Sequence, residues 1–313
     1  MLNPAVAVVG PTASGKSRLG IALARAFQGE IVGCDALQVY RQMDIGTAKV
    51  AFGEREGVRH HMLDVADPDR EFSAGDYQRR ARIALQEISG RGMLPIVVGG
   101  TGFYLRALID GLFEGPERSE ELRARMRAII RRKGSNILHR LLERIDPESA
   151  ARIAPNDADR IIRACEIHFV SGKNMSWWQS RPRDALTGYR WLKIGMDMPR
   201  ELLYQRINLR VERMFENGLL DETRRLLEIY PATCPAFKAI GYGQAAEYLS
   251  GRITLAQAVE STQMESRRYA KRQLTWFRAD SEVVWLRAGD DIDAAALEDQ
   301  ALNAMRDFLA ADL

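Results

Sequence analysis

The sequence predicts an α/β fold: a P-loop NTPase-like parallel sheet flanked by helices, with a helical insertion domain. A short apolar run at residues 5–9 leads directly into a glycine-rich loop and then into a helix-like stretch. Strand-like and helix-like segments alternate through the first third of the chain, which indicates a mostly parallel sheet covered on both faces. From about residue 117 the character changes to arginine-rich helices, so we expect an insertion into the sheet-forming core.

The glycine-rich loop at residues 10–17 reads G-P-T-A-S-G-K-S, the P-loop pattern in its expected place between a strand and a helix. Gly10 and Gly15 allow backbone N–H groups to curl around phosphate oxygens, and the helix N-terminus adds partial positive charge. Lys16 neutralises phosphate as a point charge, and the Ser17 hydroxyl suits Mg²⁺. A turn that binds nothing is the alternative, but few such turns follow a strand. We expect a phosphorylated small molecule to bind here.

The later strands follow from short apolar runs bounded by turn residues. They are expected at residues 30–32, 60–65, 94–98, 189–196 and 283–286, the last of them an edge strand. Nothing strand-like lies between the third and fourth of these runs. The expected domains are therefore residues 1–116 as the first part of the P-loop core, residues 117–188 as the helical insertion, and residues 189–313 as the return to the core with the C-terminal helices.

Two helices carry start signals. Ser73 is expected to cap a helix over residues 74–89, and Asn156 or Asp157 a helix over residues 158–170. Residues 199–230 should be helical with an interruption at an Asn-Gly pair, and residues 254–277 should form a long amphipathic helix. The inner stripe of that long helix is expected to contain Leu255, Val259, Thr262, Ala270, Leu274 and Phe277.

Composition limits the class of protein. The chain has 313 residues, enough for one large domain plus an insertion. No apolar run approaches the roughly 20 residues that a membrane span needs, and no signal-peptide n-region is present, so we expect a cytoplasmic protein without membrane contact. Cys34, Cys165 and Cys234 lie far apart without a C-x-x-C pair, which argues against a disulfide framework and against zinc.

The net charge of +3 is distributed unevenly along the chain. Residues 117–144 carry nine basic and four acidic side chains, and residues 264–278 carry five basic and one acidic. The basic residues are 38 Arg and 7 Lys, and Arg suits bidentate phosphate contacts, although a GC-rich genome produces the same bias. The local patches indicate a polyanionic partner.

Three loops of the predicted sheet should share one pocket. In open α/β sheets, ligands bind beyond the carboxyl ends of the strands. The P-loop, the segment that begins at Asp35 and the glycine-rich loop at residues 99–102 each follow directly after a strand. Asp35 and Thr101 should therefore lie beside the phosphate that the P-loop holds. The alternative for Asp35 is that it only caps a turn.

Several further motifs follow the P-loop along the chain. They are D-A-L-Q-V-Y at residues 35–40, M-D-I-G-T-A-K at 43–49, H-H-M-L-D-V at 60–65, V-G-G-T-G at 98–102, N-D-A-D-R-I-I-R-A-C-E at 156–166, F-K-A-I-G-Y at 237–242 and Y-A-K-R-Q-L-T-W-F-R at 269–278. With this ordered set the chain resembles the bacterial tRNA dimethylallyltransferase (tRNA isopentenyltransferase) family. The resemblance covers nearly the whole chain, and it is far more specific than a P-loop alone.

The resemblance implies transfer of a dimethylallyl group from dimethylallyl diphosphate to the exocyclic N6 amine of the adenosine next to the anticodon, in tRNAs that read codons beginning with U. The product would be N6-isopentenyladenosine. Asp35 would accept the amine proton as the carbon–nitrogen bond forms, and Thr101 would contact the reacting centre. One position departs from the family, which usually has Ser where this chain has Ala36. A hydroxyl that could assist Mg²⁺ or phosphate is therefore absent.

The resemblance also implies two sets of binding residues. Diphosphate would be held by Gly10, Pro11, Thr12, Ala13, Ser14, Gly15, Lys16, Ser17 and Arg210, with Mg²⁺ on Ser17. The anticodon stem-loop of tRNA would contact Asp35, Ala36, Leu37, Gln38, Thr101, Arg123, Asp159, Arg160, Ile161, Ile162, Arg163, Lys238, Ala239, Ile240, Gly241, Tyr242, Gly243, Lys271, Arg272, Gln273, Leu274, Thr275, Trp276, Phe277 and Arg278. The target base would flip out of its stack, and Tyr242 or Trp276 could stack on it. We expect a monomer.

Other functions remain open at the level of sequence. An adenylate isopentenyltransferase would prenylate AMP, ADP or ATP, but a free nucleotide does not need the arginine-rich insertion. A P-loop small-molecule kinase would use the same loop for ATP, and a non-catalytic RNA-binding module would not need Asp35 and Thr101 beside a phosphate cradle. The pair His60-His61 suggests metal, yet adjacent residues on a strand point to opposite faces, which favours structural packing.

Overall fold

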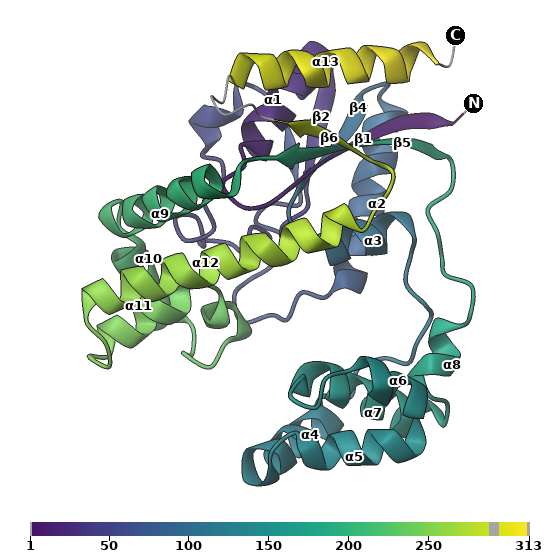
Figure 1. Cartoon of the computed structure of the whole chain (residues 1–313), viewed down its shortest axis with the longest axis vertical. Helices are drawn as coiled ribbons and strands as arrows, with labels where there is room; N and C mark the ends of the chain where they lie inside the picture. Colours follow the sequence, from purple (N-terminus) through teal and green to yellow (C-terminus); the bar gives the residue numbers. More distant parts are fainter. Residues whose placement is uncertain (1, 288–293, 312–313) are drawn as a thin grey trace. The chain divides into compact units, whose positions relative to one another are not determined.

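A single six-stranded sheet forms the centre of the larger unit of the chain (Figure 1). The structure, a computed structural model, describes residues 2–287 and 294–311. The strands are β1 (Asn3–Val9), β2 (Gly29–Gly33), β3 (His60–His61), β4 (Leu94–Gly99), β5 (Tyr189–Asp197) and β6 (Val283–Arg287). Their order is β3-β2-β4-β1-β5-β6, and every pairing is parallel. The predicted parallel sheet and its edge strand β6 are confirmed.

Helices cover both faces of the sheet. In this unit they are α1 (Lys16–Ala26), α2 (Ala74–Gly90), α3 (Gly102–Ile109), α9 (Arg200–Glu216), α10 (Leu219–Ile229), α11 (Tyr242–Leu249), α12 (Leu255–Arg278) and α13 (Ala294–Ala310), with the 3₁₀ turns η1 (Phe52–Arg55) and η2 (Pro235–Lys238). Successive residues of β1 point to opposite faces: Val6 and Val8 pack with α1 and α13, and Ala7 and Val9 with α2 and α3. A strand buried on both faces is apolar throughout, as the sequence of β1 is.

A second compact unit spans Asp110–Ala185, and the remaining segments Met1–Ile109 and Leu186–Leu313 form the first. The second unit is helical and contains α4 (Glu120–Lys133), α5 (Asn136–Ile145), α6 (Pro147–Arg152), α7 (Ala158–Ser171) and α8 (Met175–Gln179). Its core gathers Met126, Leu138, Leu142, Ile161 and Cys165. The insertion was expected at residues 117–188, a range that begins and ends later than this unit. The range 189–313, expected to return to the core, includes residues 288–293 and 312–313, which lie outside those described.

The helix start signals act as the sequence predicts. Ser73 and Asp76 form a reciprocal capping box, in which the Ser73 hydroxyl accepts from the Asp76 backbone N–H and the Asp76 carboxylate accepts from that of Ser73. The Asp157 carboxylate accepts from the backbone N–H of Arg160 at 3.2 Å and caps α7. Gly172 ends that helix in the left-handed conformation with φ 68°.

Two sequence predictions are wrong in detail. The strand expected at residues 60–65 pairs only at His60 and His61, because Met62 and Asp64 take positive φ angles of 64° and 55° that break the extended backbone. The inner stripe of α12 also differs from the six residues expected, because Leu255 is exposed and Val259 and Leu274 are only half-buried. The buried positions of that helix are Ala258, Thr262, Ala270, Gln273 and Phe277.

Among the described residues, no helix combines the length and the apolar character that crossing a membrane requires.

A buried carboxylate holds the helical unit together. Glu166 on α7 is fully buried and accepts from the backbone N–H of Ser119 at 2.8 Å. The Arg163 guanidinium donates to the same carboxylate at 2.6 Å, and that of Arg123, itself 5% exposed, at 3.5 Å. Removal of one member of such a group leaves uncompensated buried charge.

We therefore expect Glu166→Ala to lower the free energy of unfolding of the helical unit by about 3–5 kcal/mol. Urea denaturation followed by hydrogen exchange of α4 and α7 measures the loss. The matched control is Glu121→Ala, which removes a surface pair with Arg125 and should cost less than about 1 kcal/mol. Equal losses for the two variants would contradict the structural role of Glu166.

Candidate active site

Two cavities of the larger unit meet at the P-loop. The smaller, about 370 Å³, lies where β1, β2 and β4 end, and it is lined by residues that include Thr12, Lys16, Asp35, Arg210 and Gln273. The larger, about 890 Å³, is lined by residues of α9, of η1 and of the segment between β2 and β3. Lys16, Ser17, Ala48, Arg210 and Met214 line both cavities. The P-loop thus borders both cavities.

The P-loop has the backbone geometry that the sequence predicts. Gly10 has φ 147° and Gly15, the N-cap of α1, has φ 93°, both values that favour glycine. A Cβ on Gly10 would lie 3.1 Å from the Cβ of Met196 on β5, so the loop also needs glycine to fit against the neighbouring strand. The Lys16 ammonium donates to the carbonyl of Pro11 at 2.8 Å, which folds its side chain over the loop.

The P-loop, Lys16 and Arg210 together form what we call the anion cradle. It contains two neighbouring cations and buried polar atoms that are available to a ligand. Ser14 Oγ and Arg210 Nε are buried and have no hydrogen-bond partner within the part of the chain that the structure describes. Burial and the neighbouring Arg210 guanidinium lower the pKa of Lys16 to about 8, against the opposing effect of Asp35. Burial likewise lowers the pKa of Arg210. Two desolvated cations beside unsatisfied donors form a site that an anion such as a diphosphate would stabilise.

Asp35 both caps a turn and lines the smaller cavity. Its Oδ1 accepts from the backbone N–H groups of Leu37 at 2.9 Å and Gln38 at 3.4 Å, which is the capping role that the sequence left open. The half-buried carboxylate also lies close enough to raise the pKa values of Lys16 and Arg210 by its charge. The turn therefore holds a negative group at a defined place beside the cations.

Thr101 lies beside the Asp35 turn. Its Oγ1 accepts from the backbone N–H of Ala36 at 3.0 Å, and its own N–H donates to the carbonyl of Cys34 at 3.1 Å. The loop after β4 is in this way joined to the loop after β2. Asp35 and Thr101 come together as the strand order predicts.

Gln273 on α12 joins the P-loop to the loop after β4. Its Oε1 accepts from the backbone N–H of Thr12 at 2.8 Å, and its Nε2 donates to the carbonyl of Gly100 at 2.9 Å. A Cβ on Gly100 would overlap the amide, so glycine is required there. The residue was expected to contact tRNA, but it is buried against the two loops. The sequence signal that could have indicated this burial is an amide side chain on the inner face of an amphipathic helix.

Tyr269, one helical turn before Gln273, is a site residue that the sequence analysis missed. It lines the smaller cavity together with Asp35. Burial and the Asp35 carboxylate raise the pKa of Tyr269 to about 12, so its hydroxyl keeps its proton at neutral pH. Its spacing of four residues from Gln273 could have indicated a shared face.

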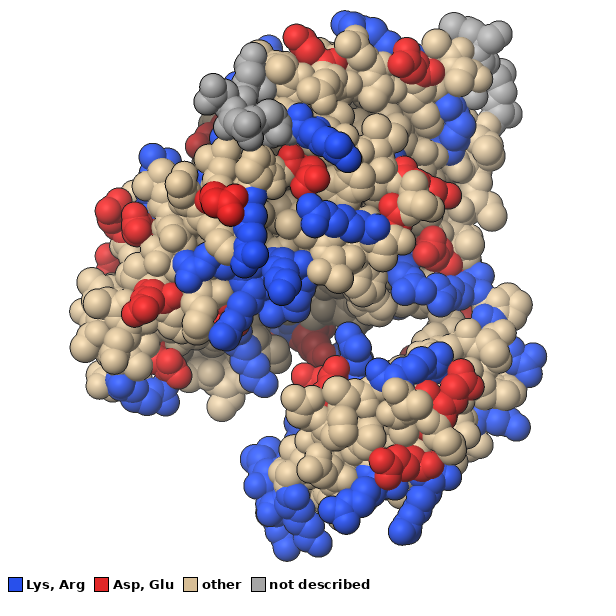
Figure 2. Space-filling model, viewed as in Figure 1, with Lys and Arg blue, Asp and Glu red and all other residues tan. Residues whose placement is uncertain are grey.

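The other positions expected to contact tRNA fall into two groups. Those with exposed side chains on α12 are Lys271, Arg272, Thr275, Trp276 and Arg278, and Figure 2 shows Lys and Arg side chains gathered over this helix. Lys238 next to the smaller cavity and Asp159 and Arg160 on α7 are exposed as well.

The second group is held inside the protein. Ile161 and Ile162 lie in the core of the helical unit, Arg123 and Arg163 bind Glu166, and Phe277 packs beneath the sheet. Tyr242 is fully buried, and its hydroxyl donates to Glu222, so its ring cannot stack on a flipped base. The side chain of Arg163 is 25% exposed, and the other side chains of this group support the fold of their surroundings. Leu274 is half-buried against Ala270.

The paired histidines have protein partners. His61 Nε2 lies 2.6 Å from the Glu30 carboxylate, and His60 Nδ1 lies 2.9 Å from the carbonyl of Val58. Within residues 2–287 and 294–311, no group of three or more His, Cys, Asp or Glu side chains is arranged to hold a metal ion. The structural role that the sequence favours for this pair agrees with these contacts.

Comparison with known proteins decides the family. A family model described as IPP transferase matches residues 38–280. The chain belongs to the IPP transferase family. It is 49% identical over 308 residues to a tRNA dimethylallyltransferase of Solibacter usitatus, with 98% of this chain and 99% of that relative covered. A tRNA dimethylallyltransferase of Koribacter versatilis is 51% identical over 300 residues, with coverages of 96% and 97%.

Solved structures of the IPP transferase family share the fold. The tRNA isopentenylpyrophosphate transferase of Bacillus halodurans matches with a TM-score of 0.72 and 39% identity, covering 100% of this chain and 99% of that one. A eukaryotic dimethylallyltransferase acting on tRNA matches with a TM-score of 0.79 and 27% identity, covering 99% and 80%. The resemblance seen in the sequence is confirmed, and the protein is a prenyltransferase of this family.

The pKa of Lys16 leads to a test of the anion cradle. An ammonium with a pKa of about 8 is charged below that pH and neutral above it. Affinity for an alkyl diphosphate, whose phosphates are already fully ionised, should be constant up to about pH 8 and then fall about tenfold per pH unit. Titration calorimetry between pH 7 and 9.5 measures this profile. Lys16→Arg keeps its charge over the range and should flatten it, whereas a flat profile for the unmodified protein would contradict the role of Lys16.

Proposed function

We propose that the protein transfers the dimethylallyl group of dimethylallyl diphosphate to the exocyclic N6 amine of an adenosine in tRNA. The acceptor would be the adenosine next to the anticodon in tRNAs that read codons beginning with U. The observation that carries the proposal is that a carboxylate, Asp35, and an anion cradle built on Lys16 and Arg210 line one cavity of about 370 Å³. Relatives named tRNA dimethylallyltransferase over nearly the full length of the chain support it.

The cradle would act on the leaving group. As the allylic carbon–oxygen bond breaks, the electron pair departs with the diphosphate, and charge grows on its bridging oxygen. Lys16, Arg210 and the N–H groups of the P-loop are already oriented by the fold, so they stabilise that charge without reorganisation. Ser14 Oγ and Arg210 Nε, which form no hydrogen bond with the described residues, would offer further donors to the anion.

Mg²⁺ fits the same place. Ser17 is exposed and lines both cavities. One protein hydroxyl, completed by diphosphate oxygens and water, suits this ion, which is bound by few protein groups and keeps several waters. A bound Mg²⁺ would neutralise part of the diphosphate charge. Ala36 contributes no hydroxyl, so Ser17 would be the protein's hydroxyl ligand.

Asp35 would act on the acceptor. The amine of adenine is far too weak an acid to ionise first, so its nitrogen attacks the allylic carbon while a neighbouring base takes the proton. Asp35 accepts that proton, and the hydroxyl groups of Thr101 and Tyr269 orient the amine. The nitrogen–carbon bond forms as the carbon–oxygen bond breaks, and the proton leaves the nitrogen for the carboxylate.

The acceptor would reach the cavity as a flipped base. A base paired or stacked inside a stem-loop cannot enter an enclosed site, so the nucleotide must leave its stack. The exposed cations of α12 would contact the phosphate backbone, and Trp276, which is 40% exposed, would offer a surface for stacking. The reaction would take place in the cytoplasm, where this acceptor is found.

A transfer assay tests the proposal. The purified protein is mixed with dimethylallyl diphosphate, Mg²⁺ and either unmodified tRNA or AMP, and phosphoryl transfer from ATP is followed in parallel. We expect prenylated tRNA and free diphosphate. Prenylated AMP with unmodified tRNA would identify an adenylate isopentenyltransferase, and phosphate transfer from ATP would identify a kinase.

Asp35→Asn separates the two roles of the carboxylate. The amide oxygen of Asn can still accept from the turn at Leu37 and Gln38, but the side chain cannot take up a proton. We expect single-turnover prenyl transfer to slow by roughly 10²–10⁴-fold while the affinity for tRNA stays nearly unchanged. Asp67→Asn, a surface residue that lines neither cavity, is the control. A large loss of tRNA affinity in Asp35→Asn would instead make Asp35 a recognition group.

A further inference from the structure

The segment of residues 44–49 forms part of the wall of both cavities. Thr47 and Ala48 line the smaller one, and Asp44, Ile45, Ala48 and Lys49 line the larger. The segment has no helix or strand, and Ala48 takes a positive φ of 45°. Within the segment, the N–H groups of Ala48 and Lys49 donate to the carbonyls of Ile45 and Asp44 at 3.0 Å each, and the N–H groups of residues 44–46 need partners outside it.

One buried carboxylate binds the beginning of this segment. Glu222 on α10 is 3% exposed and faces three successive backbone N–H groups. Its Oε2 accepts from Asp44 at 3.1 Å and Ile45 at 3.0 Å, and its Oε1 accepts from Ile45 at 3.1 Å and Gly46 at 3.3 Å. Consecutive amides that converge on one anion form a nest, and hydrogen bonds to a charged group are the stronger kind.

The nest is closed by a tyrosine. The hydroxyl of Tyr242 on α11 donates to Glu222 Oε1, and its ring packs directly on Gly46, where a Cβ would overlap it. The motifs M-D-I-G-T-A-K and F-K-A-I-G-Y are thus joined through one carboxylate. Neither Glu222 nor this use of Tyr242 is visible from motif spacing.

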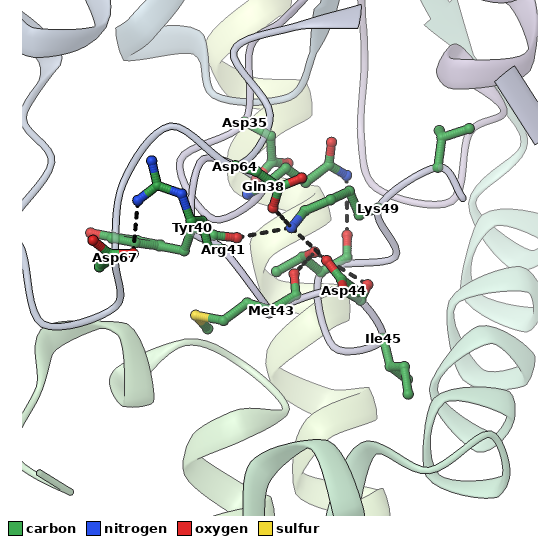
Figure 3. A network of polar contacts seen from close by, with 12 residues as sticks. Asp35, Gln38, Tyr40, Arg41, Met43, Asp44, Ile45, Lys49, Asp64 and Asp67 are labelled. Carbon is green, nitrogen blue, oxygen red and sulfur yellow. Dashed lines mark hydrogen bonds and ion pairs between the residues drawn. The ribbon is translucent and has the colours of Figure 1, made fainter. Parts of the chain in front are cut away.

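Other side chains hold the second half of the segment. The Lys49 ammonium donates to the carbonyl of Tyr40 at 2.8 Å and pairs with Asp44 at 2.6 Å and Asp64 at 2.7 Å (Figure 3). The Thr47 hydroxyl donates to the carbonyl of Met43 at 2.6 Å. The segment is therefore anchored at both ends.

The fixed segment presents the carbonyl of Thr47 to two site residues at once. Arg210, a cation of the cradle, donates to it through Nη2 at 3.4 Å. Gln38, which follows the Asp35 turn, donates to it through Nε2 at 3.1 Å. Arg210 Nε has no hydrogen-bond partner among the described residues, and the contact of Nη2 with this carbonyl orients the guanidinium.

We propose that Glu222 is a positioning residue for the diphosphate site: by holding the amides of residues 44–46, it fixes the Thr47 carbonyl and thereby aims Arg210 at the leaving group. This proposal rests on the proposed function for the identity of the anion. Glu222 lines neither of the two cavities. It acts through the segment, and a carboxylate is required because every group that faces its two oxygens is a donor.

Glu222→Gln tests this requirement with almost no change in volume. Whichever way the amide turns, its NH₂ group faces backbone N–H donors, so the nest must open. We expect the affinity for inorganic diphosphate to fall about tenfold and the KM for dimethylallyl diphosphate to rise in parallel, with the affinity for tRNA changed less. Glu228→Gln, on the exposed side of the same helix, is the control and should leave both values as they are.

A double-mutant cycle separates positioning from general damage. If Glu222 acts through Arg210, the losses of diphosphate affinity in Glu222→Gln and Arg210→Lys are less than additive when the two are combined. Full additivity, or unchanged diphosphate affinity in Glu222→Gln, overturns the proposal. Should Glu222→Gln not fold, Tyr242→Phe removes one of the same donors and enters the same cycle, with the same criterion. Because the readout is binding of inorganic diphosphate, a protein that transfers no prenyl group would refute the proposed function without deciding this cycle.

Discussion

The register of three parallel strands is the constraint on which the site depends. Val9 of β1 lies beside Gly99 of β4, and Val98 of β4 lies beside Gly33 of β2, so all three strands end at one level. Each loop that leaves this edge carries a different part of the proposed site: the P-loop, the Asp35 carboxylate and Thr101. Parallel pairing is what brings them together, since antiparallel neighbours would send alternate loops to opposite edges.

Contacts between these loops then restrict their conformational freedom. Thr101 binds the backbone of the Asp35 turn, and Gln273 binds both the P-loop and Gly100. In the proposed reaction, groups held in this way would need little rearrangement as charge moves from the acceptor to the leaving diphosphate. Electrostatic preorganisation of this kind is commonly the largest contribution to catalysis, and it requires such rigid support.

Buried carboxylates organise both units of the chain, in each case by collecting donors. Glu166 gathers two arginines and a backbone N–H in the helical unit, and Glu222 gathers three backbone N–H groups and a tyrosine beside the site. A buried charge is stable only when its hydrogen bonds are satisfied, and its removal or replacement is therefore felt by every group it holds. In this protein the same device stabilises a helical core in one place and shapes a cavity wall in another.

Local chemistry was enough to predict the parallel sheet, the P-loop, the capped helices and the meeting of Asp35 with Thr101, because apolar periodicity, glycine spacing and strand order are all written along the chain. The helix α12 shows where such reasoning ends: its basic motif predicted RNA contacts, but Gln273 and Phe277 of that motif point inward and only part of it is exposed. Tyr242 and Arg123 were likewise expected to contact tRNA, and Glu222 was overlooked. Which face of a helix is buried, and which distant carboxylate meets which donor, depends on contacts between residues as far apart as Asp44 and Glu222, and only the folded chain decides them.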